Sequence, residues 1–300
     1  MFKKKFLIVL LIIVIFSCSS DSNPAAGINN NDVELNFVGD NQNLDIVTWN
    51  IQNFPKHDLT IQYVRQCVNE LNVDIIALQE IESGTSLTAL QESLGSNWIF
   101  FKSSTSPYGN LAYLINTANI TINSPYNILS SYSYEFAGRT PYVLELNYNN
   151  EDFTLINVHY KCCSDSVNDP DNSDRRRASS IAIYDYIHSN LDNSNVIILG
   201  DFNDILGNTN TVLDVFENDI NSFTFADQSI ADGPSENWSF PTYGAYGSHI
   251  DHILITNELT DNVISTMTIK IDDSLFESFA DYDYYISDHR PIGISLFISE

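Results

Sequence analysis

Asn195-Val196-Ile197-Ile198-Leu199-Gly200-Asp201-Phe202-Asn203 is an apolar run that ends on a carboxylate and a carboxamide. The run has the length and composition of a buried strand. Asp201 and Asn203 are two residues apart, so their side chains point to the same side of an extended chain. One acid and one amide at a strand end suit a divalent cation and a phosphate oxygen. The stretch therefore predicts a functional edge at the carboxyl end of this strand.

Other parts of the chain repeat this arrangement. Three further apolar runs end on Asn50, Glu80 and His159, and the segment 287–291 near the C-terminus contains Asp288 and His289. Folding alone gives little reason for such residues at five separate strand ends. We therefore expect these side chains to form one site.

Short apolar runs of strand length outnumber helical patterns in this chain. The predicted strands cover 44–49, 74–79, 98–102, 111–116, 142–147, 153–158, 196–200, 250–255, 263–270 and 292–298. The predicted helices run from an N-cap at Asp58 to Leu71, over 87–94, and from about Asp174 to Leu191. This balance argues against a doubly wound nucleotide fold. It favours an α/β fold with two β-sheets packed face to face and helices outside.

The first residues have the features of an export signal. Lys3–Lys5 precede an apolar run of 11 residues, Phe6–Phe16, which is too short for a comfortable membrane span. Ile15-Phe16-Ser17-Cys18 resembles a bacterial lipobox. We predict a lipoprotein signal peptide over 1–17 and lipid attachment at Cys18. An ordinary secretory signal with an incidental cysteine is the alternative.

Residues 18–43 are rich in Asn and Ser and show no periodicity, which predicts a flexible tether after the lipidated cysteine. Residues 44–300 are long enough for one large α/β domain, and the chain is 43% hydrophobic. We expect an exported monomer, attached to the membrane of the bacterial cell envelope through its lipid anchor. It would be periplasmic or surface-exposed.

The charge of the chain limits its partners. The formal net charge is −26, so the protein has no general electrostatic attraction to polyanions. Nucleic-acid binding would need a local basic patch or a bound metal. Arg175-Arg176-Arg177 is the one basic cluster after the signal segment.

Three cysteines remain besides Cys18, and they cannot all pair with one another. Cys67 lies in a predicted helix and is expected to be buried. Cys162 and Cys163 follow His159 closely, and the sequence leaves open a vicinal disulfide, two free thiols or two metal-binding thiols.

Six segments in order resemble the endonuclease/exonuclease/phosphatase superfamily, which has the deoxyribonuclease-I-like fold. The segments are Trp49-Asn50, Leu78-Gln79-Glu80, Asn157-Val158-His159, Gly200-Asp201-Phe202-Asn203, Ile250-Asp251-His252-Ile253-Leu254 and Ser287-Asp288-His289-Arg290-Pro291. The resemblance spans about 44–299. It implies a four-layered α/β sandwich that cuts phosphate esters with a divalent metal.

The resemblance assigns metal binding to Glu80, to the amide oxygen of Asn50, and to Asp288. The implied ion is Mg²⁺, which prefers hard oxygen ligands, with Mn²⁺ and Ca²⁺ as alternatives.

The resemblance also implies roles at the phosphate. Asp201 would orient or deprotonate the attacking water, and Asn203 would hold a phosphate oxygen. His159 and His289 would flank the phosphate as imidazolium groups, with Asp251 accepting a hydrogen bond from His289. The sequence leaves open whether His289 is instead the general base.

Residues outside the six segments are candidates for substrate contact. Arg139 stands where family members often carry an arginine, and Arg176 would contact substrate phosphates. Tyr108, Tyr243 and Tyr246 lie in predicted rim loops where they would stack on bases. We expect His57, His188 and His252 to be structural or surface residues.

These patterns predict an exported, metal-dependent phosphodiesterase, and most directly a nuclease that hydrolyses extracellular DNA or RNA. A phospholipid hydrolase of the sphingomyelinase type, or a hydrolase of small phosphate esters, would share the chemistry. A non-catalytic binding lipoprotein with the same fold is a third hypothesis.

Overall fold

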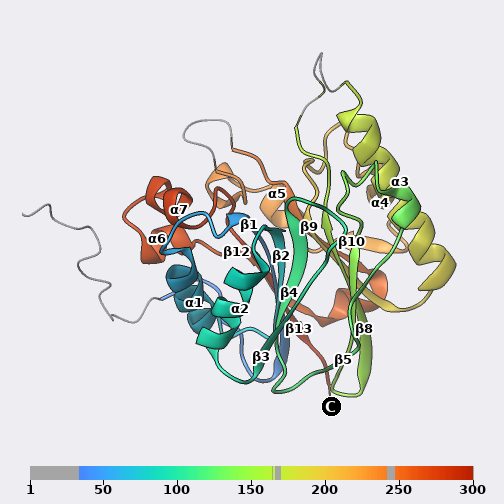
Figure 1. The fold of residues 1–300 in the computed structure, drawn as a ribbon. Coiled ribbons are helices and arrows are strands. Elements are labelled where there is room, and N and C mark those ends of the chain that lie inside the picture. Colours follow the sequence, from blue (N-terminus) through green and yellow to red (C-terminus); the bar gives the residue numbers. More distant parts are fainter. Residues whose placement is uncertain (1–33, 164, 166–169, 242–246, 300) are drawn as a thin grey trace, which may run out of the picture. The chain divides into compact units, whose positions relative to one another are not determined.

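Two β-sheets form the centre of the protein in the computed structural model, which describes residues 34–163, 165, 170–241 and 247–299. The first sheet has the order β12–β13–β1–β2–β4–β3 (Figure 1). Its strands are β1 (Asn43–Phe54), β2 (Ile75–Ile81), β3 (Trp98–Lys102), β4 (Asn110–Asn116), β12 (Val263–Thr268) and β13 (Ile292–Phe297).

The second sheet has the order β10–β11–β9–β8–β7–β5, and β6 also pairs with β7. Its strands are β5 (Thr121–Ile122), β6 (Tyr126–Asn127), β7 (Tyr142–Tyr148), β8 (Glu151–His159), β9 (Asn195–Asp201), β10 (Phe223–Phe225) and β11 (Asp251–Thr256). The ten predicted strands are confirmed, and the short β5, β6 and β10 were not predicted.

The helices cover the outer faces of the two sheets, except the short helix that carries Ile230, which packs into the core between the sheets. They are α1 (Thr60–Leu71), α2 (Gly84–Leu94), α3 (Asn172–Asn190), α4 (Asp214–Glu217), α5 (Gln228–Ala231), α6 (Ile271–Leu275) and α7 (Phe279–Tyr285). The described residues also form three 3₁₀ helices: η1 (Ser130–Tyr132), η2 (Ser235–Asn237) and η3 (Asn257–Asn262).

Alternating side chains explain the layers. In β1, Leu44 and Ile46 enter the core between the two sheets, whereas Val47 and Trp49 enter the core under α1 and α2. The strand is buried on both faces, and its sequence is therefore a nearly continuous apolar run. A third core joins the second sheet to α3 and α4. The predicted four-layered sandwich of two mixed sheets with helices outside is confirmed.

The starts of two helices differ from prediction. The predicted N-cap at Asp58 is wrong: α1 begins at Thr60, and the residue at its N-cap position, Leu59, makes no side-chain cap. The backbone of His57 donates instead to Thr60 Oγ1, at 2.8 Å. Helix α2 starts three residues before the predicted 87 because the Ser83 hydroxyl accepts from the Ser86 amide.

The packed part of the chain begins before the predicted boundary at residue 44. Leu35 and Phe37 are buried in the core under the first sheet. The ring of Phe37 lies against Gly293, where a Cβ atom would come within 2.9 Å of it. The predicted signal peptide and Cys18 lie outside the described residues. Within the described ranges, no helix is long and apolar enough to cross a membrane.

Candidate active site

The register of the second sheet brings three predicted site residues together. Asp201 on β9 is the direct partner of His159 on β8 and of Asp251 on β11. Register partners on adjacent strands point to the same face of a sheet. Gly200 allows the close approach of β8, because a Cβ atom there would lie 2.0 Å from the Val158 carbonyl oxygen.

The first sheet supplies the other half of the site. Asn50 lies in β1 where the regular pairing with β2 is interrupted. It reaches across to the second sheet, and its Nδ2 donates to Asp201 Oδ2 at 3.0 Å and to Glu80 Oε1 at 3.3 Å. The Asn53 amide donates to Glu80 Oε2 at 3.0 Å. Glu80 has a φ of +63° at the irregularity in β2, and its side chain is 24% exposed. Glu80 is therefore held in place and still open to a ligand.

The orientation of Asn50 differs from the predicted one. Its Oδ1 accepts from the Gln52 amide at 3.2 Å, and its nitrogen faces the two carboxylates. In this arrangement Asn50 orients Glu80 and Asp201. The predicted metal contact through its oxygen would need the amide to turn over.

Three carboxylates surround His289. Its Nδ1 lies 2.7 Å from Asp251 Oδ2, and its Nε2 lies 4.0 Å from Asp201 Oδ2 and 3.9 Å from Asp288 Oδ1. Burial alone would lower the pKa of His289. The charge and hydrogen bond of Asp251, with the charges of Asp201 and Asp288, outweigh burial and raise the pKa to about 10. His289 is thus an imidazolium at neutral pH, and as such it cannot act as the general base.

The surroundings of Asp201 favour the neutral form of its carboxyl group. Burial and the neighbouring charge of Asp251 raise its pKa, and although His289, Asn50 and the Asn203 amide oppose them, the pKa stands at about 7. The Asn203 amide donates to Asp201 Oδ1 at 2.9 Å. A carboxylate that titrates near neutral pH suits a general base.

His159 does not carry the predicted charge. Burial, Arg139 and His289 lower its pKa well below the usual range, so the imidazole is neutral at neutral pH. Its Nε2 lies 3.4 Å from Asp201 Oδ2 and 4.0 Å from Glu80 Oε1. Its buried Nδ1 has no hydrogen-bond partner among the described residues. His159 is therefore a neutral ring that lies beside the Asp201 carboxylate.

Arg139 lies near the site, where the charges of Asp201 and Glu80 act on it, and its contact with substrate stays a prediction. A Cβ atom on Gly109 would lie 3.8 Å from Glu80 Cα and 3.9 Å from Arg139 Nη1. Arg139 Nη2 donates to the Tyr160 carbonyl at 2.9 Å, while its buried Nε has no partner within the described part of the chain.

Arg176 lies elsewhere. It is buried, and its Nη1 donates to the carbonyls of Cys163 at 2.7 Å and Lys161 at 3.2 Å. Its Nε donates to Asp204 Oδ2 at 3.3 Å. These contacts give Arg176 a structural role, holding the segment after β8 against α3, and they leave the predicted phosphate contact without support.

The remaining predicted residues divide into three groups. Tyr108 is 74% exposed, next to Gly109, whereas Tyr243 and Tyr246 lie outside the described residues. His57 packs against Tyr284 and Tyr285, and His188 lies 3.3 Å from Asp219, so both are structural as expected. His252 is buried beside Asp227.

The three cysteines among the described residues are free thiols. Cys67 is buried, and burial raises the pKa of its thiol. The Cys162 and Cys163 sulfur atoms are 2.7 Å apart and are not joined as a disulfide.

Sequence reasoning missed the hydrogen bonds that join the two sheets beneath the site. Gln79 Nε2 donates to Asn157 Oδ1 at 2.8 Å, and Asn157 Nδ2 donates to the Leu78 and Ala112 carbonyls. The signal was present, since each residue is polar within an otherwise apolar run.

A second missed support fixes the turn that carries His289. The Ser287 hydroxyl donates to the Asn50 carbonyl at 2.6 Å, and Tyr282 donates to the His289 carbonyl at 2.5 Å. No local pattern marks Tyr282.

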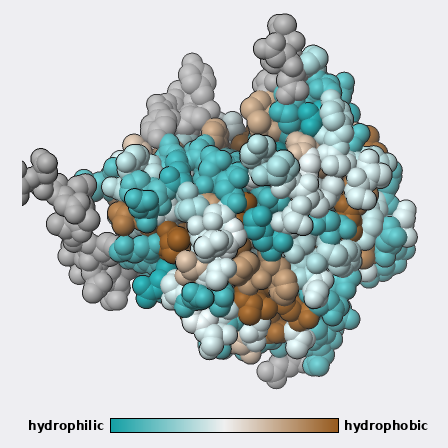
Figure 2. Space-filling view, viewed as in Figure 1, coloured by the Kyte–Doolittle hydropathy of each residue, from teal (hydrophilic) through white to brown (hydrophobic). Residues whose placement is uncertain are grey.

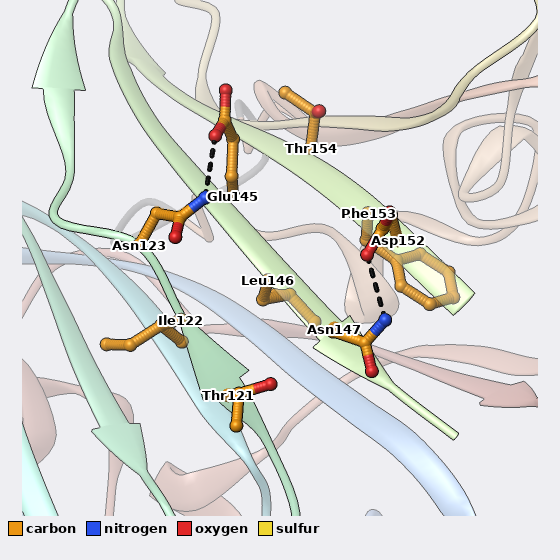
Figure 3. Close-up of a pocket in the computed structure, with 9 residues that line it drawn as sticks. All are labelled: Thr121, Ile122, Asn123, Glu145, Leu146, Asn147, Asp152, Phe153 and Thr154. Atoms are coloured by element: carbon orange, nitrogen blue, oxygen red, sulfur yellow. Dashed lines mark hydrogen bonds between the residues drawn. The ribbon is translucent and has the colours of Figure 1, made fainter. Parts of the chain in front are cut away.

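One surface cavity of about 310 Å³ is separate from this cluster (Figure 3). It is lined by β5, β7 and the start of β8, whereas His159 is the last residue of β8. Four of its polar side chains pair with each other, Asn123 with Glu145 and Asn147 with Asp152.

The sequence from 47 to 289 matches the model of the Endonuclease/Exonuclease/phosphatase family. The chain belongs to this family. Its members are metal-dependent phosphoesterases and nucleases, and the assembled residues agree with that chemistry. A search of curated protein sequences gives no match.

Solved structures share the fold at low identity. D. rerio TDP2 in complex with a single-strand DNA product is 15% identical, with a TM-score of 0.65 over 84% of this chain and 98% of that one. An endonuclease/exonuclease/phosphatase family protein from Bacteroides thetaiotaomicron is 15% identical, with a TM-score of 0.64 over 86% and 98%. The 3′ phosphatase NExo from Neisseria, bound to a product DNA hairpin, is 17% identical, with a TM-score of 0.62 over 84% and 99%.

The donor set fits a hard divalent cation. Glu80 and Asp288 offer partly exposed carboxylates, and burial raises the pKa of Asp288, with the charges of Asp283 and Glu80 adding to it. A cation would relieve this crowding of negative groups. Asp201, Asp251 and His289 also lie close together, but a protonated His289 has no lone pair to offer an ion.

Proposed function

We propose that this protein is an exported, metal-dependent phosphodiesterase that acts as a nuclease on extracellular DNA or RNA. The main support is a pair of groups at the site, Asp201 and His289, whose pKa values are both raised. Asp201 is a buried carboxyl group with a pKa of about 7, and His289 is an imidazolium with a pKa of about 10. Groups whose pKa values are pushed apart in this way serve as base and charge stabiliser.

In the proposed reaction Asp201 takes a proton from the attacking water. Asn50 and the Asn203 amide hold the Asp201 carboxylate by hydrogen bonds, with neutral His159 3.4 Å away, so the carboxylate does not rotate as it accepts the proton. His289 faces the growing negative charge on the phosphoryl oxygens, and Asp251 keeps it charged and oriented.

Glu80 and Asp288 would hold the metal, which when bound polarises the phosphate and neutralises its charge. The identity of the metal belongs to the proposal, with Mg²⁺ first and Mn²⁺ or Ca²⁺ as alternatives. Arg139, whose Nε has no hydrogen-bond partner among the described residues and whose Nη1 borders Gly109 as Glu80 does, would contact a phosphate oxygen.

The nucleic-acid substrate is proposed from two of the structural neighbours. The TDP2 and NExo structures contain DNA products, at 15% and 17% identity to this chain. Export and membrane attachment are proposed from residues 1–17 and Cys18, and a monomeric state from the single large domain.

One observation favours a second candidate, a phospholipid or small phosphate-ester hydrolase. The chain has a net charge of −26, and Figure 2 shows a face covered largely by hydrophilic residues. An acidic surface repels long polyanions.

The test uses the chain from residue 19 onward with supercoiled plasmid, structured RNA, sphingomyelin vesicles and bis-p-nitrophenyl phosphate. Each is incubated with Mg²⁺, Mn²⁺, Ca²⁺ or EDTA. We expect metal-dependent nicking that is lost in Asp201→Asn and retained in Asp192→Asn, which removes an exposed acid. Cleavage of vesicles without nicking would support the second candidate. No cleavage of any substrate would contradict both.

A further inference from the structure

A second cluster of titratable groups lies buried behind the site. Asp227, between β10 and α5, is fully buried, and so is His252 on β11. Asp227 Oδ2 lies 2.8 Å from His249 Nε2 and 2.7 Å from His252 Nδ1. Its Oδ1 accepts from the Ile253 amide at 2.9 Å.

The partners of His252 define its protonation. Its Nδ1 faces the Asp227 carboxylate, and its Nε2 lies 2.9 Å from the Asp204 carbonyl oxygen. Carboxylate and carbonyl oxygens only accept hydrogen bonds, so both ring nitrogens must carry protons. His252 is therefore an imidazolium that forms an ion pair with Asp227.

The hydrogen-bond partners of His249 indicate a ring with one proton, in contrast to the two protons of His252. The Ser239 amide donates to His249 Nδ1 at 3.2 Å, so this nitrogen is an acceptor and the proton of the neutral ring is on Nε2. That proton is directed at Asp227 Oδ2. The three residues match the ligand set of a metal site, but a ligating Nε2 would have to lose this proton. The hydrogen bonds thus favour a proton network over a metal site.

The network is connected to the reaction site on two sides. His252 directly follows Asp251 on β11, so their side chains point to opposite faces of the sheet. His252 also contacts the carbonyl of Asp204, which lies in the turn just after Asp201 and Asn203. On the other side, Ser239 Oγ accepts from the Asp251 amide at 3.2 Å.

Ser239 continues the connection to His289. Its carbonyl accepts from the Arg290 amide at 2.7 Å, and the ring of the adjacent Phe240 lies 4.8 Å from the His289 ring. One buried carboxylate thus joins the segments that carry Asp201, Asp251 and His289.

We propose that Asp227 is a positioning residue, which acts through His249 and His252 to keep Asp201, Asp251 and His289 at the spacing needed for proton transfer. This proposal rests on the proposed phosphodiester hydrolysis. Asp227 itself does not touch the reacting atoms.

The test compares Asp227→Asn with Ile255→Val, which removes one methyl group from β11, the strand that carries His252. We expect Asp227→Asn to lower kcat on bis-p-nitrophenyl phosphate by more than tenfold and to change KM less than threefold. The Ile255→Val control should keep kcat within twofold. In the same variants, NMR of the histidine rings should show a lower pKa for His289 in Asp227→Asn alone.

A folded Asp227→Asn variant with wild-type kcat and an unchanged His289 pKa would overturn the proposal. If that variant does not fold, Ser239→Ala tests the same connection, and a kcat within twofold of wild type would contradict it. ¹⁵N NMR of the wild-type rings at pH 7 should show both nitrogens of His252 and only Nε2 of His249 protonated. A metal bound in stoichiometric amount to these rings would refute the network. An inactive wild type would refute the proposed function, while the His289 pKa in Asp227→Asn would still decide the positioning role.

Discussion

Replacing Asp251 with Asn tests the electrostatics of the site most directly. Asp251 is the strongest favourable partner of His289 and also raises the pKa of Asp201. Its loss should therefore lower both pKa values. In the wild type, Asp201 must be ionised and His289 protonated, so activity should rise through about pH 7 and fall through about pH 10.

The size of the effect follows from His289. If its pKa fell from about 10 to the unperturbed value of about 6.5, roughly one molecule in 30 would carry the charge at pH 8. Asp201 and Asp288 still face the ring at 4.0 Å and 3.9 Å, so this is the upper limit of the loss. We expect Asp251→Asn to reduce kcat/KM at pH 8 by up to about 30-fold, with part of the activity returning at lower pH.

The assay is the pH profile of kcat/KM on bis-p-nitrophenyl phosphate at saturating metal, with Asp192→Asn as the matched control. Both limbs should move to lower pH in Asp251→Asn and stay in place in the control. Reduced activity with unmoved limbs would refute the reasoning, because it would mean that Asp251 does not set the charge state of His289 or Asp201.

Three further changes test other parts of the structure. Glu80→Gln should weaken Mn²⁺ binding at least about tenfold by calorimetry, because a full negative charge leaves a site of hard oxygen ligands; unchanged affinity would place the metal elsewhere. Gly200→Ala should destabilise the fold by more than about 4 kcal/mol, because its Cβ would lie 2.0 Å from a backbone oxygen of β8. Gly84→Ala, with no atom within 4 Å of its Cβ, should stay within about 1 kcal/mol of wild type in urea unfolding. Gln79→Leu leaves Asn157 Oδ1 without its donor at 2.8 Å, and we expect it to lower the free energy of unfolding by about 1–3 kcal/mol. Wild-type stability would show that this hydrogen bond between the sheets contributes little.

The sequence by itself determined the layers and the chemical identity of the site. Strands such as β1 are buried on both faces, and for this reason their sequences are long apolar runs that are recognisable without a structure. The polar residue that ends each run stands out against that background, which is why Glu80, His159 and Asp201 were predicted from the sequence.

The tertiary structure decided what each of these residues does. His159 and His289 look alike in the sequence, yet burial and Arg139 make the first neutral, whereas three carboxylates make the second charged. Arg176 was predicted to bind phosphate, but its guanidinium donates to the carbonyls of Lys161 and Cys163. These carbonyls belong to the segment after β8, whose position depends on the packing of α3. The charge state of a buried group depends on neighbours contributed by other strands and on the exclusion of water. Register and packing fix both, and a linear pattern contains neither.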